Sequence, residues 1–332
     1  MILHLLRLFP IFQVPTSNSM RLALYPLALA VVLAACAAPI PSVTDDAPVV
    51  NAAQLLEDLQ TLSAPDMAGR RPNTPGHERA QNFIVERFTD AGVQPVGAAH
   101  RHEFMFVPRG AHDEERGVNI LAMVPGSVYL DLYIVVTAHY DHLGVRNGDI
   151  YHGADDNASG TAALFAIAAE LQRQAPRHSV ILAAVDAEEM GLRGARHFVA
   201  NPPVPQDQIV LNINMDMISR NDADELYAAG AFHYPFLAPV IQRTAANAPI
   251  TLLMGHDDPA LGPREDWTML SDHGAFHEAG IPFVYFGVED HEDYHQPTDT
   301  FENIHPDFYP LAVETVIGFL REVDGERLSG RR

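Results

Sequence analysis

The stretch LYIVVTAHYDH occupies residues 132–142 and sets the interpretation of the whole chain. A mostly apolar, β-branched run ends abruptly at His139-Tyr140-Asp141-His142. A short run of this composition, bounded by polar residues, predicts a buried strand. The polar residues then lie at the carboxyl end of that strand, where open α/β sheets bind their ligands.

Three further segments repeat this arrangement. Residues 179–185 read SVILAAV before Asp-Ala-Glu-Glu, residues 209–215 read IVLNINM before Asp216, and residues 281–287 read IPFVYFG, with His295 after an acidic loop. Apolar residues at helical spacing over 75–91 and an apolar run over 158–171 predict helices. Strands that alternate with helices predict an α/β sheet covered on both faces.

Composition favours a single large domain of a soluble enzyme. The 332 residues carry a net charge of −22, which makes nucleic acid an improbable partner. All 21 basic residues are Arg, and the absence of Lys excludes lysine-based catalysis. We expect one catalytic domain over residues 52–323 and a polar tail over 324–332.

The N-terminal segment predicts export. From Met20 the chain reads Met-Arg, then an apolar stretch, then Leu33-Ala34-Ala35-Cys36, so residues 1–35 form an expected export signal with its true start at Met20. The last four residues resemble a bacterial lipobox, which makes Cys36 the expected lipidated residue and residues 36–51 a tether. The alternative is an ordinary signal peptide with an incidental Cys. Either way Cys36 is the chain's only cysteine, and the expected location is the periplasm or, through the lipid, the outer membrane.

Five side chains with metal-binding atoms follow the predicted strands or open the second helix. Singly, each has an ordinary alternative: a His-x-Asp pair in a surface loop, an Asp that caps a helix, or a solvated acidic turn. Together they predict a metal site, because imidazole and carboxylate groups are zinc ligands. The candidates are His139, Asp155, Glu189, Asp216 and His295.

The neighbours of these candidates suggest how such a site works. Asp141 is a candidate acceptor for the second ring nitrogen of His139. Adjacent carboxylates repel unless a cation or a proton intervenes, so one of Glu188 and Glu189 can bind a metal while its neighbour acts as general base. Two divalent cations balance Asp155, Glu188, Glu189 and Asp216, whereas one cation leaves excess negative charge in a partly buried cleft. Other histidines near the motifs are interpreted as supporting or surface residues: His142, His152, His273, His277 and His291.

The motifs AHYDH, GADDNASG, DAEEMGLRGARHF, NMDM, SDH and YHQPTDT, taken in this order, resemble the co-catalytic zinc peptidases of the bacterial leucyl aminopeptidase type. The resemblance covers roughly residues 52–320 and implies three layers with a mixed, mostly parallel central sheet. It also implies two zinc ions bridged by Asp155. His139 and Asp216 would bind one ion, and Glu189 and His295 the other.

The same resemblance implies a metallo-aminopeptidase that acts on peptides, with Glu188 as the base. Thr268 stands where aminopeptidase relatives can carry an oxyanion-binding Tyr, so Tyr294, before the last His, is the candidate donor. One alternative is a single-zinc enzyme like the glutaminyl cyclases, although these tend to have Trp at the position of Tyr294. The other is a peptide-binding lipoprotein without catalysis, which the complete set of ligands and base argues against.

Overall fold

A computed structural model describes residues 48–108 and 110–329. The predicted signal (1–35), its start at Met20 and Cys36 lie outside the described residues, as does most of the tether. No helix in the described part of the chain is long and apolar enough to cross a bilayer.

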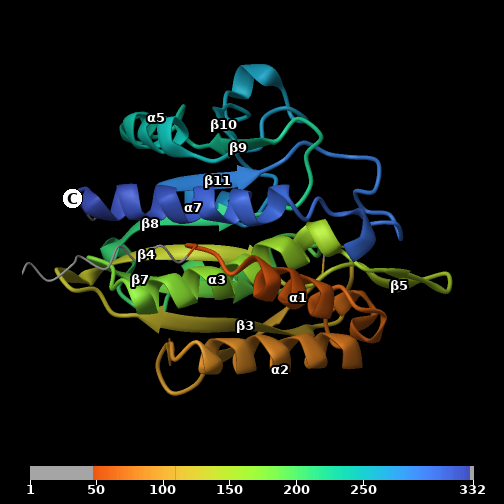
Figure 1. Ribbon diagram of the computed structural model, residues 1–332. Helices are drawn as coiled ribbons and strands as arrows, with labels where there is room; N and C mark the ends of the chain where they lie inside the picture. The colour runs from red at the N-terminus through yellow and green to blue at the C-terminus, as the bar shows by residue number, and fades with distance from the viewer. Residues whose placement is uncertain (1–47, 109, 330–332) are drawn as a thin grey trace, which may run out of the picture. The chain divides into compact units, whose positions relative to one another are not determined.

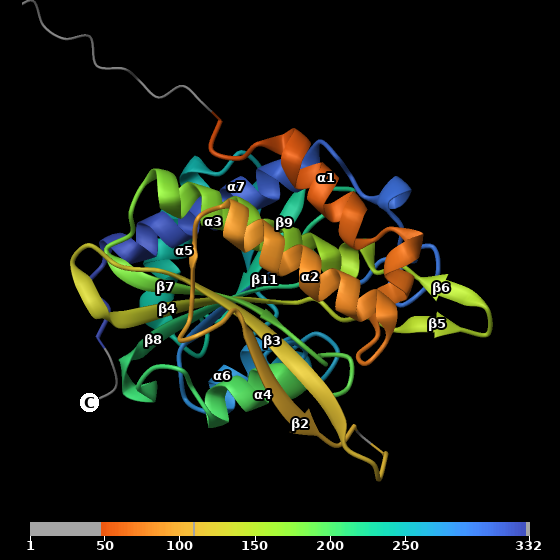
Figure 2. The ribbon, with the colours of Figure 1, turned by 90° about the horizontal axis from the view of Figure 1, so that it is seen from below.

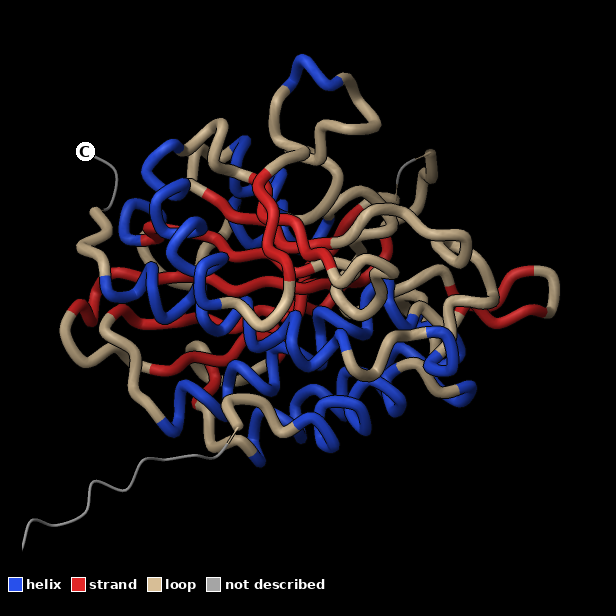
Figure 3. The backbone as a smooth tube through the Cα atoms, turned by 45° about the horizontal axis from the view of Figure 1, so that its top comes forward, coloured by secondary structure: helices blue, strands red, loops and turns tan. Residues whose placement is uncertain are grey.

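A nine-stranded sheet forms the centre of the domain, in the order β1-β3-β7-β4-β8-β11-β9-β10, with β2 also paired to β3 (Figure 1). Its middle strands β7, β4, β8 and β11 are parallel, and antiparallel pairs join them to β3 on one side and β9 on the other. The strands are β1 (Gln94–Pro95), β2 (Arg101–Phe106), β3 (Glu115–Val124), β4 (Tyr129–His139), β7 (His178–Val185), β8 (Ile209–Met215), β9 (Glu225–Ala229), β10 (Thr251–Met254) and β11 (Phe283–Gly287). A separate hairpin of β5 (Gly144–Arg146) and β6 (Asp149–Tyr151) projects from the domain (Figure 3).

Helices cover both faces of this sheet, as the alternating pattern predicted. Helices α1, α2, α3 and α7 lie on one side and α4 and α6 on the other (Figure 2). Every residue of β7 and β8 is buried, which explains why both sequences are mostly apolar. The helices are α1 (Ala52–Leu62), α2 (Pro75–Asp90), α3 (Gly160–Arg173), α4 (Arg193–Ala200), α5 (Ala238–Asn247), α6 (His273–Glu278) and α7 (Phe308–Gly325).

Local sequence signals account for several element ends. Thr74 caps α2 by accepting a hydrogen bond from the backbone of His77, and Pro75 occupies the first turn. The predicted polar tail begins too early, because α7 continues to Gly325. Asp324 is buried there and accepts hydrogen bonds from the backbone N–H groups of Arg177 and His178.

Candidate metal centre

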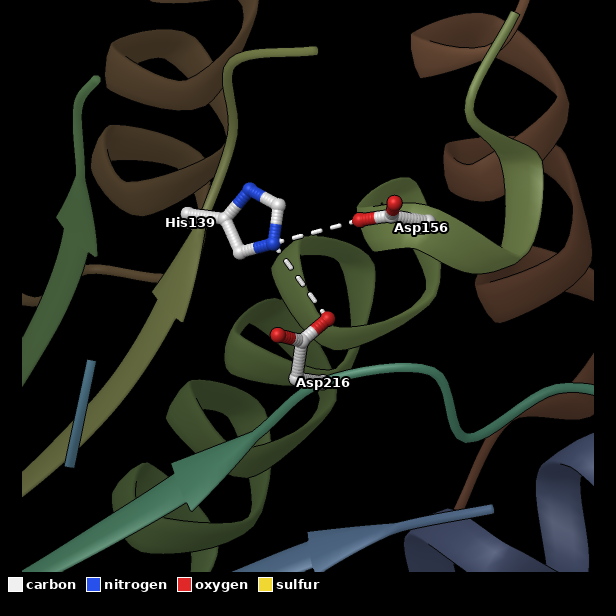
Figure 4. A group of neighbouring side chains, drawn as sticks. All are labelled: His139, Asp156 and Asp216. Atoms are coloured by element: carbon white, nitrogen blue, oxygen red, sulfur yellow. Dashed lines mark hydrogen bonds and ion pairs between the residues drawn. The ribbon is translucent and has the colours of Figure 1, made fainter. Parts of the chain in front are cut away.

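The carboxyl ends of the parallel strands bring the predicted polar side chains together. His139 is the last residue of β4, and Asp216 directly follows β8. A short turn, η2 (Ala154–Ser159), leads into α3 and carries two consecutive aspartates. Figure 4 shows His139, Asp156 and Asp216 pointing toward one another from these three segments.

These three side chains form a first ligand group. The Nε2 atom of His139 lies 3.3 Å from Oδ1 of Asp156 and 3.3 Å from Oδ1 of Asp216. All three residues are buried. Two ligands of a tetrahedral zinc ion, each bound at about 2.1 Å, are about 3.4 Å apart, so the spacing suits one ion. His139, Asp156 and Asp216 can therefore bind a metal together.

Asp156, and not the predicted Asp155, faces both ligand groups, so the structure moves the candidate bridging carboxylate by one residue. Asp155 turns away: its Oδ1 accepts hydrogen bonds from the backbone and hydroxyl of Ser219, both at 2.7 Å, and its Oδ2 lies 3.0 Å from Nε2 of His291. Asp156 instead faces His139 with Oδ1 and His295 with Oδ2. Neighbouring side chains on a turn diverge, so only one of the two aspartates can face both ligand groups.

A second ligand group shares Asp156. The Nε2 atom of His295 lies 3.0 Å from Oδ2 of Asp156 and 3.4 Å from Oε2 of Glu189. His142 reaches the same place, with Nδ1 2.8 Å from Oε1 of Glu189. The structure thus brings four of the five predicted ligands together with Asp156, and it adds His142, which sequence analysis had set aside.

Asp141 supports the site differently from the prediction. The Nδ1 atom of His139 contacts the backbone carbonyl of Asp141 at 3.1 Å, while the Asp141 carboxylate lies 3.7 Å away. An N–H at Nδ1 leaves the lone pair on Nε2 free for a metal. The Asp141 carboxylate instead accepts the backbone N–H of Glu188 at 3.0 Å and so fixes the loop of the two glutamates.

Glu188 lies beside both ligand groups and lines a cavity with Asp156 and Asp216. Burial raises the pKa of Glu188 well above its usual value; the His139 ring opposes this rise, and nearby carboxylates, including Asp272, add to it. A carboxylate with a raised pKa readily accepts a proton. This environment suits the predicted general base.

The cavity has a volume of about 170 Å³, and apolar and aromatic residues line it together with the carboxylates. The ring of Tyr294 stacks on His295 at 4.0 Å, and burial raises the pKa of Tyr294, so its phenol stays protonated at neutral pH. Thr268, by contrast, is hydrogen-bonded to Asp266 and His233. The apolar wall consists of Met217, Trp267, Leu270, Tyr285 and Val288.

This wall was not predicted from the sequence in detail. Trp267 and Leu270 lie in the segment between β10 and α6. The segment supports the wall through His256, whose ring stacks on Trp267 with centroids 3.7 Å apart. Without the fold, a single Trp in a loop gives no signal of such a role.

Two buried residues outside the ligand groups fix the ligand-bearing loops. Asp299 accepts the backbone N–H groups of Asp155 and Asp156 at 2.8 and 3.1 Å. Arg70 is fully buried and donates to the carbonyls of Tyr140 and Gly153, among others, at 2.7 and 2.8 Å. Asp299 lies in the motif YHQPTDT, but the sequence alone assigns no role to Asp299 or to Arg70.

The donor sets fit zinc at both positions. Each combines imidazole nitrogen with carboxylate oxygen, and they share Asp156. Within the described residues, Oε1 of Glu189 is buried and makes no aligned hydrogen bond. A buried oxygen of this kind is expected where a cation binds. With Asp156 in place of Asp155, the charge count is unchanged: Asp156, Glu188, Glu189 and Asp216 balance two divalent ions.

Comparison with known proteins assigns the family. Residues 119–320 match the model of Peptidase family M28. The chain belongs to this family. The matched segment contains both ligand groups and Glu188, so family membership and site geometry rest on the same residues.

Curated members of this family align with much of the chain. Aminopeptidase YwaD of Bacillus subtilis is 32% identical over 201 residues, which cover 57% of this chain and 40% of YwaD. Leupeptin-inactivating enzyme 1 of Streptomyces exfoliatus is 28% identical over 260 residues, or 77% of this chain and 52% of the enzyme. The chain therefore spans only about half the length of these relatives.

Solved structures share the fold at low sequence identity. A glutaminyl cyclase from Porphyromonas gingivalis has a TM-score of 0.67 and 19% identity, and the match covers 83% of this chain and 100% of the cyclase. The zinc aminopeptidase BSAP from Bacillus subtilis also has a TM-score of 0.67, with 16% identity over 82% of this chain and 95% of BSAP. These matches confirm the predicted three-layer α/β fold with its mixed, mostly parallel sheet.

Proposed function

We propose that the chain is a zinc-dependent exopeptidase, an aminopeptidase that removes N-terminal residues from peptides. The observation that carries this proposal is the pair of ligand groups joined at Asp156, with Glu188 beside them. The aminopeptidases and zinc metalloproteases among the relatives support it.

Zinc ions at the two positions would lower the pKa of a water molecule to about 7 and polarise the scissile carbonyl. Glu188 takes a proton from the attacking water and passes it to the departing amine. The Tyr294 phenol, held by its stack on His295, donates a hydrogen bond to the oxygen that gains charge. Asp141 holds the backbone of Glu188 in place through the hydrogen bond at 3.0 Å.

The cavity favours a free N-terminal residue as the group to be bound. Its described lining combines an apolar wall with the carboxylates of Glu188 and Asp290 and contains no Arg. A substrate α-ammonium group is stabilised by such carboxylates, whereas a substrate carboxylate would be repelled. An apolar first side chain fits against Trp267 and Leu270.

A substrate screen tests the proposal. The wild-type protein should hydrolyse aminoacyl anilides with apolar first residues and lose this activity on treatment with a chelator. Glu188→Gln should retain the zinc content of the wild type but lose about 10²–10⁴-fold in kcat, the usual contribution of general acid–base catalysis. Glu189→Gln serves as the matched control and should lose metal as well as activity.

The same screen separates the alternatives. Cyclisation of a glutaminyl peptide without anilide hydrolysis would identify a glutaminyl cyclase instead. Zinc binding with neither activity would leave a peptide-binding protein. Near wild-type turnover by Glu188→Gln would exclude Glu188 as the base.

For location, we infer an exported lipoprotein attached to a membrane through Cys36 alone. The support is the sequence Leu33-Ala34-Ala35-Cys36 after an apolar segment. The lipid would then position the catalytic domain at a membrane surface outside the cytoplasm.

A further inference from the structure

His142 is a buried histidine whose ring lacks ordinary partners. Its exposed fraction is 1%, and within the described residues neither ring nitrogen has an aligned hydrogen-bond partner. Buried polar groups nearly always have a partner, because an unsatisfied one costs about 1–3 kcal/mol. The ring packs closely on Gly153, where an added Cβ atom would lie 2.6 Å from its Cγ and Cδ2 atoms.

The ring nitrogen Nδ1 points at the second ligand group. It lies 2.8 Å from Oε1 of Glu189 and 3.7 Å from Oδ2 of Asp156. These two distances bracket the separation of about 3.4 Å between neighbouring ligands of a tetrahedral zinc ion. Oε1 of Glu189 is itself buried and, within the described chain, makes this contact with His142 but no aligned hydrogen bond. Nδ1 of His142 and Oε1 of Glu189 are therefore two buried polar atoms that point at the same position, as the ligands of one cation do.

We propose that His142 binds zinc through Nδ1 at the second position, together with Asp156, Glu189 and His295. This inference rests on the metal chemistry of the proposed function and adds His142 to the ligands His139, Asp156, Glu189, Asp216 and His295. His139, Asp156 and Asp216 provide three protein ligands at the first position, whereas the second position has four.

Ligand number gives the two positions different properties. Catalytic zinc sites keep three protein ligands and an open place for water or substrate, whereas structural sites are closed by four. The second position is therefore the one that retains its ion, and the first is the one where water and substrate exchange. The protein should release its two ions in two steps, the second far more slowly than the first.

Two substitutions distinguish a ligand from a residue that only orients Glu189. His142→Gln retains a side-chain N–H donor for Glu189 but is a poor zinc ligand. His142→Cys provides a thiolate, which binds zinc strongly but does not act as a neutral donor. His152→Gln is the matched control, because His152 lies in the same loop region and donates to the carbonyl of Ser63 at 2.9 Å.

The experiment measures metal binding by competition with a chelator, without reference to peptidase activity. His142→Gln should weaken the tighter of two zinc-binding steps by more than about 100-fold, beyond the range for residues that merely support a ligand. His142→Cys should recover tight binding. Its cobalt-loaded form should show a thiolate-to-cobalt absorption band in the near ultraviolet that the wild type lacks, although the wild type contains Cys36. His152→Gln should bind like the wild type.

Wild-type affinity in His142→Gln, or absence of the cobalt band in His142→Cys, would overturn the assignment. The cobalt result remains decisive if the Gln variant folds poorly, because the band depends on the Cys variant alone. Failure of the wild type to bind any zinc would instead contradict the proposed function.

Discussion

Adjacent aspartates at the start of α3 divide two tasks between them. Asp156 faces the two ligand groups, while Asp155 accepts two hydrogen bonds from Ser219 and contacts His291. The segment after β8 is thereby tied to the turn that carries the bridging carboxylate. Asp156 provides negative charge for cations, and the hydrogen bonds of Asp155 hold the turn that carries Asp156 in place.

Substitution of each aspartate separates these tasks. Asp156→Asn removes a charge shared by both ligand groups, so zinc affinity should fall by more than about 100-fold, beyond the effect of losing a supporting residue. Asp155→Asn keeps an acceptor oxygen for Ser219 and should bind zinc within about tenfold of the wild type. Isothermal titration of both variants measures the difference. Stronger zinc loss in Asp155→Asn than in Asp156→Asn would restore Asp155 as the bridge.

Sequence could identify the kinds of ligand but not the direction of each side chain. Four of the ligands lie at or after the end of a strand: His139, Glu189, Asp216 and His295. Strand ends can be recognised in the sequence as changes from apolar to polar residues. Asp155 and Asp156 lie in a turn where periodicity gives no orientation. His142 and the carbonyl of Asp141 act through loop geometry, for which the sequence contains no pattern.

At the scale of elements, Arg70 joins three segments that are distant in sequence. Its guanidinium donates to the carbonyl of Leu62 at the end of α1, to Tyr140 after β4, and to His152 and Gly153 before η2. Burial lowers the pKa of Arg70 to about 10, so the group remains charged at neutral pH. The loops that carry His139 and Asp156 are thus held by one side chain.

Loss of this side chain should destabilise the domain. Arg70→Met leaves four buried carbonyls without their donor, and we expect a loss on the order of 3 kcal/mol or more in the free energy of unfolding. Arg71→Met is the matched control, because Arg71 is half exposed and lies 3.8 Å from Glu115. An exposed ion pair of this kind contributes about 0–1 kcal/mol. Urea unfolding of the zinc-free proteins measures both values, and equal effects would refute the role of Arg70.

The elements themselves were more predictable than their connections. The predicted strand 209–215 coincides with β8, and the predicted helix 75–91 differs from α2 by one residue. Buried central strands and capped helices have strong local patterns. The boundary at 324 was wrong because Asp324, a polar residue, is held by backbone N–H groups of another segment.

At the scale of the whole molecule, net charge favours some substrates over others, and the proposed lipid anchor sets where the protein meets them. A net charge of −22 favours the approach of cations, including metal ions and peptides with free amino groups, over anions. The described domain includes no helix able to span a bilayer. The attachment that we propose is through Cys36, which precedes the expected catalytic domain.

Replacement of Cys36 should release the protein without altering the enzyme. In a bacterial host that processes lipoproteins, the wild type should sediment with membranes, because buried acyl chains contribute about 0.8 kcal/mol per CH₂ group. Cys36→Ser should appear in the soluble fraction with unchanged kcat, since the ligand groups and Glu188 all lie beyond residue 138. Glu188→Gln is the control that should stay with the membranes. Mass spectrometry of the mature N-terminus checks the modification directly. An unmodified Cys36, or a Cys36→Ser variant that still sediments with membranes, would show that another segment is responsible.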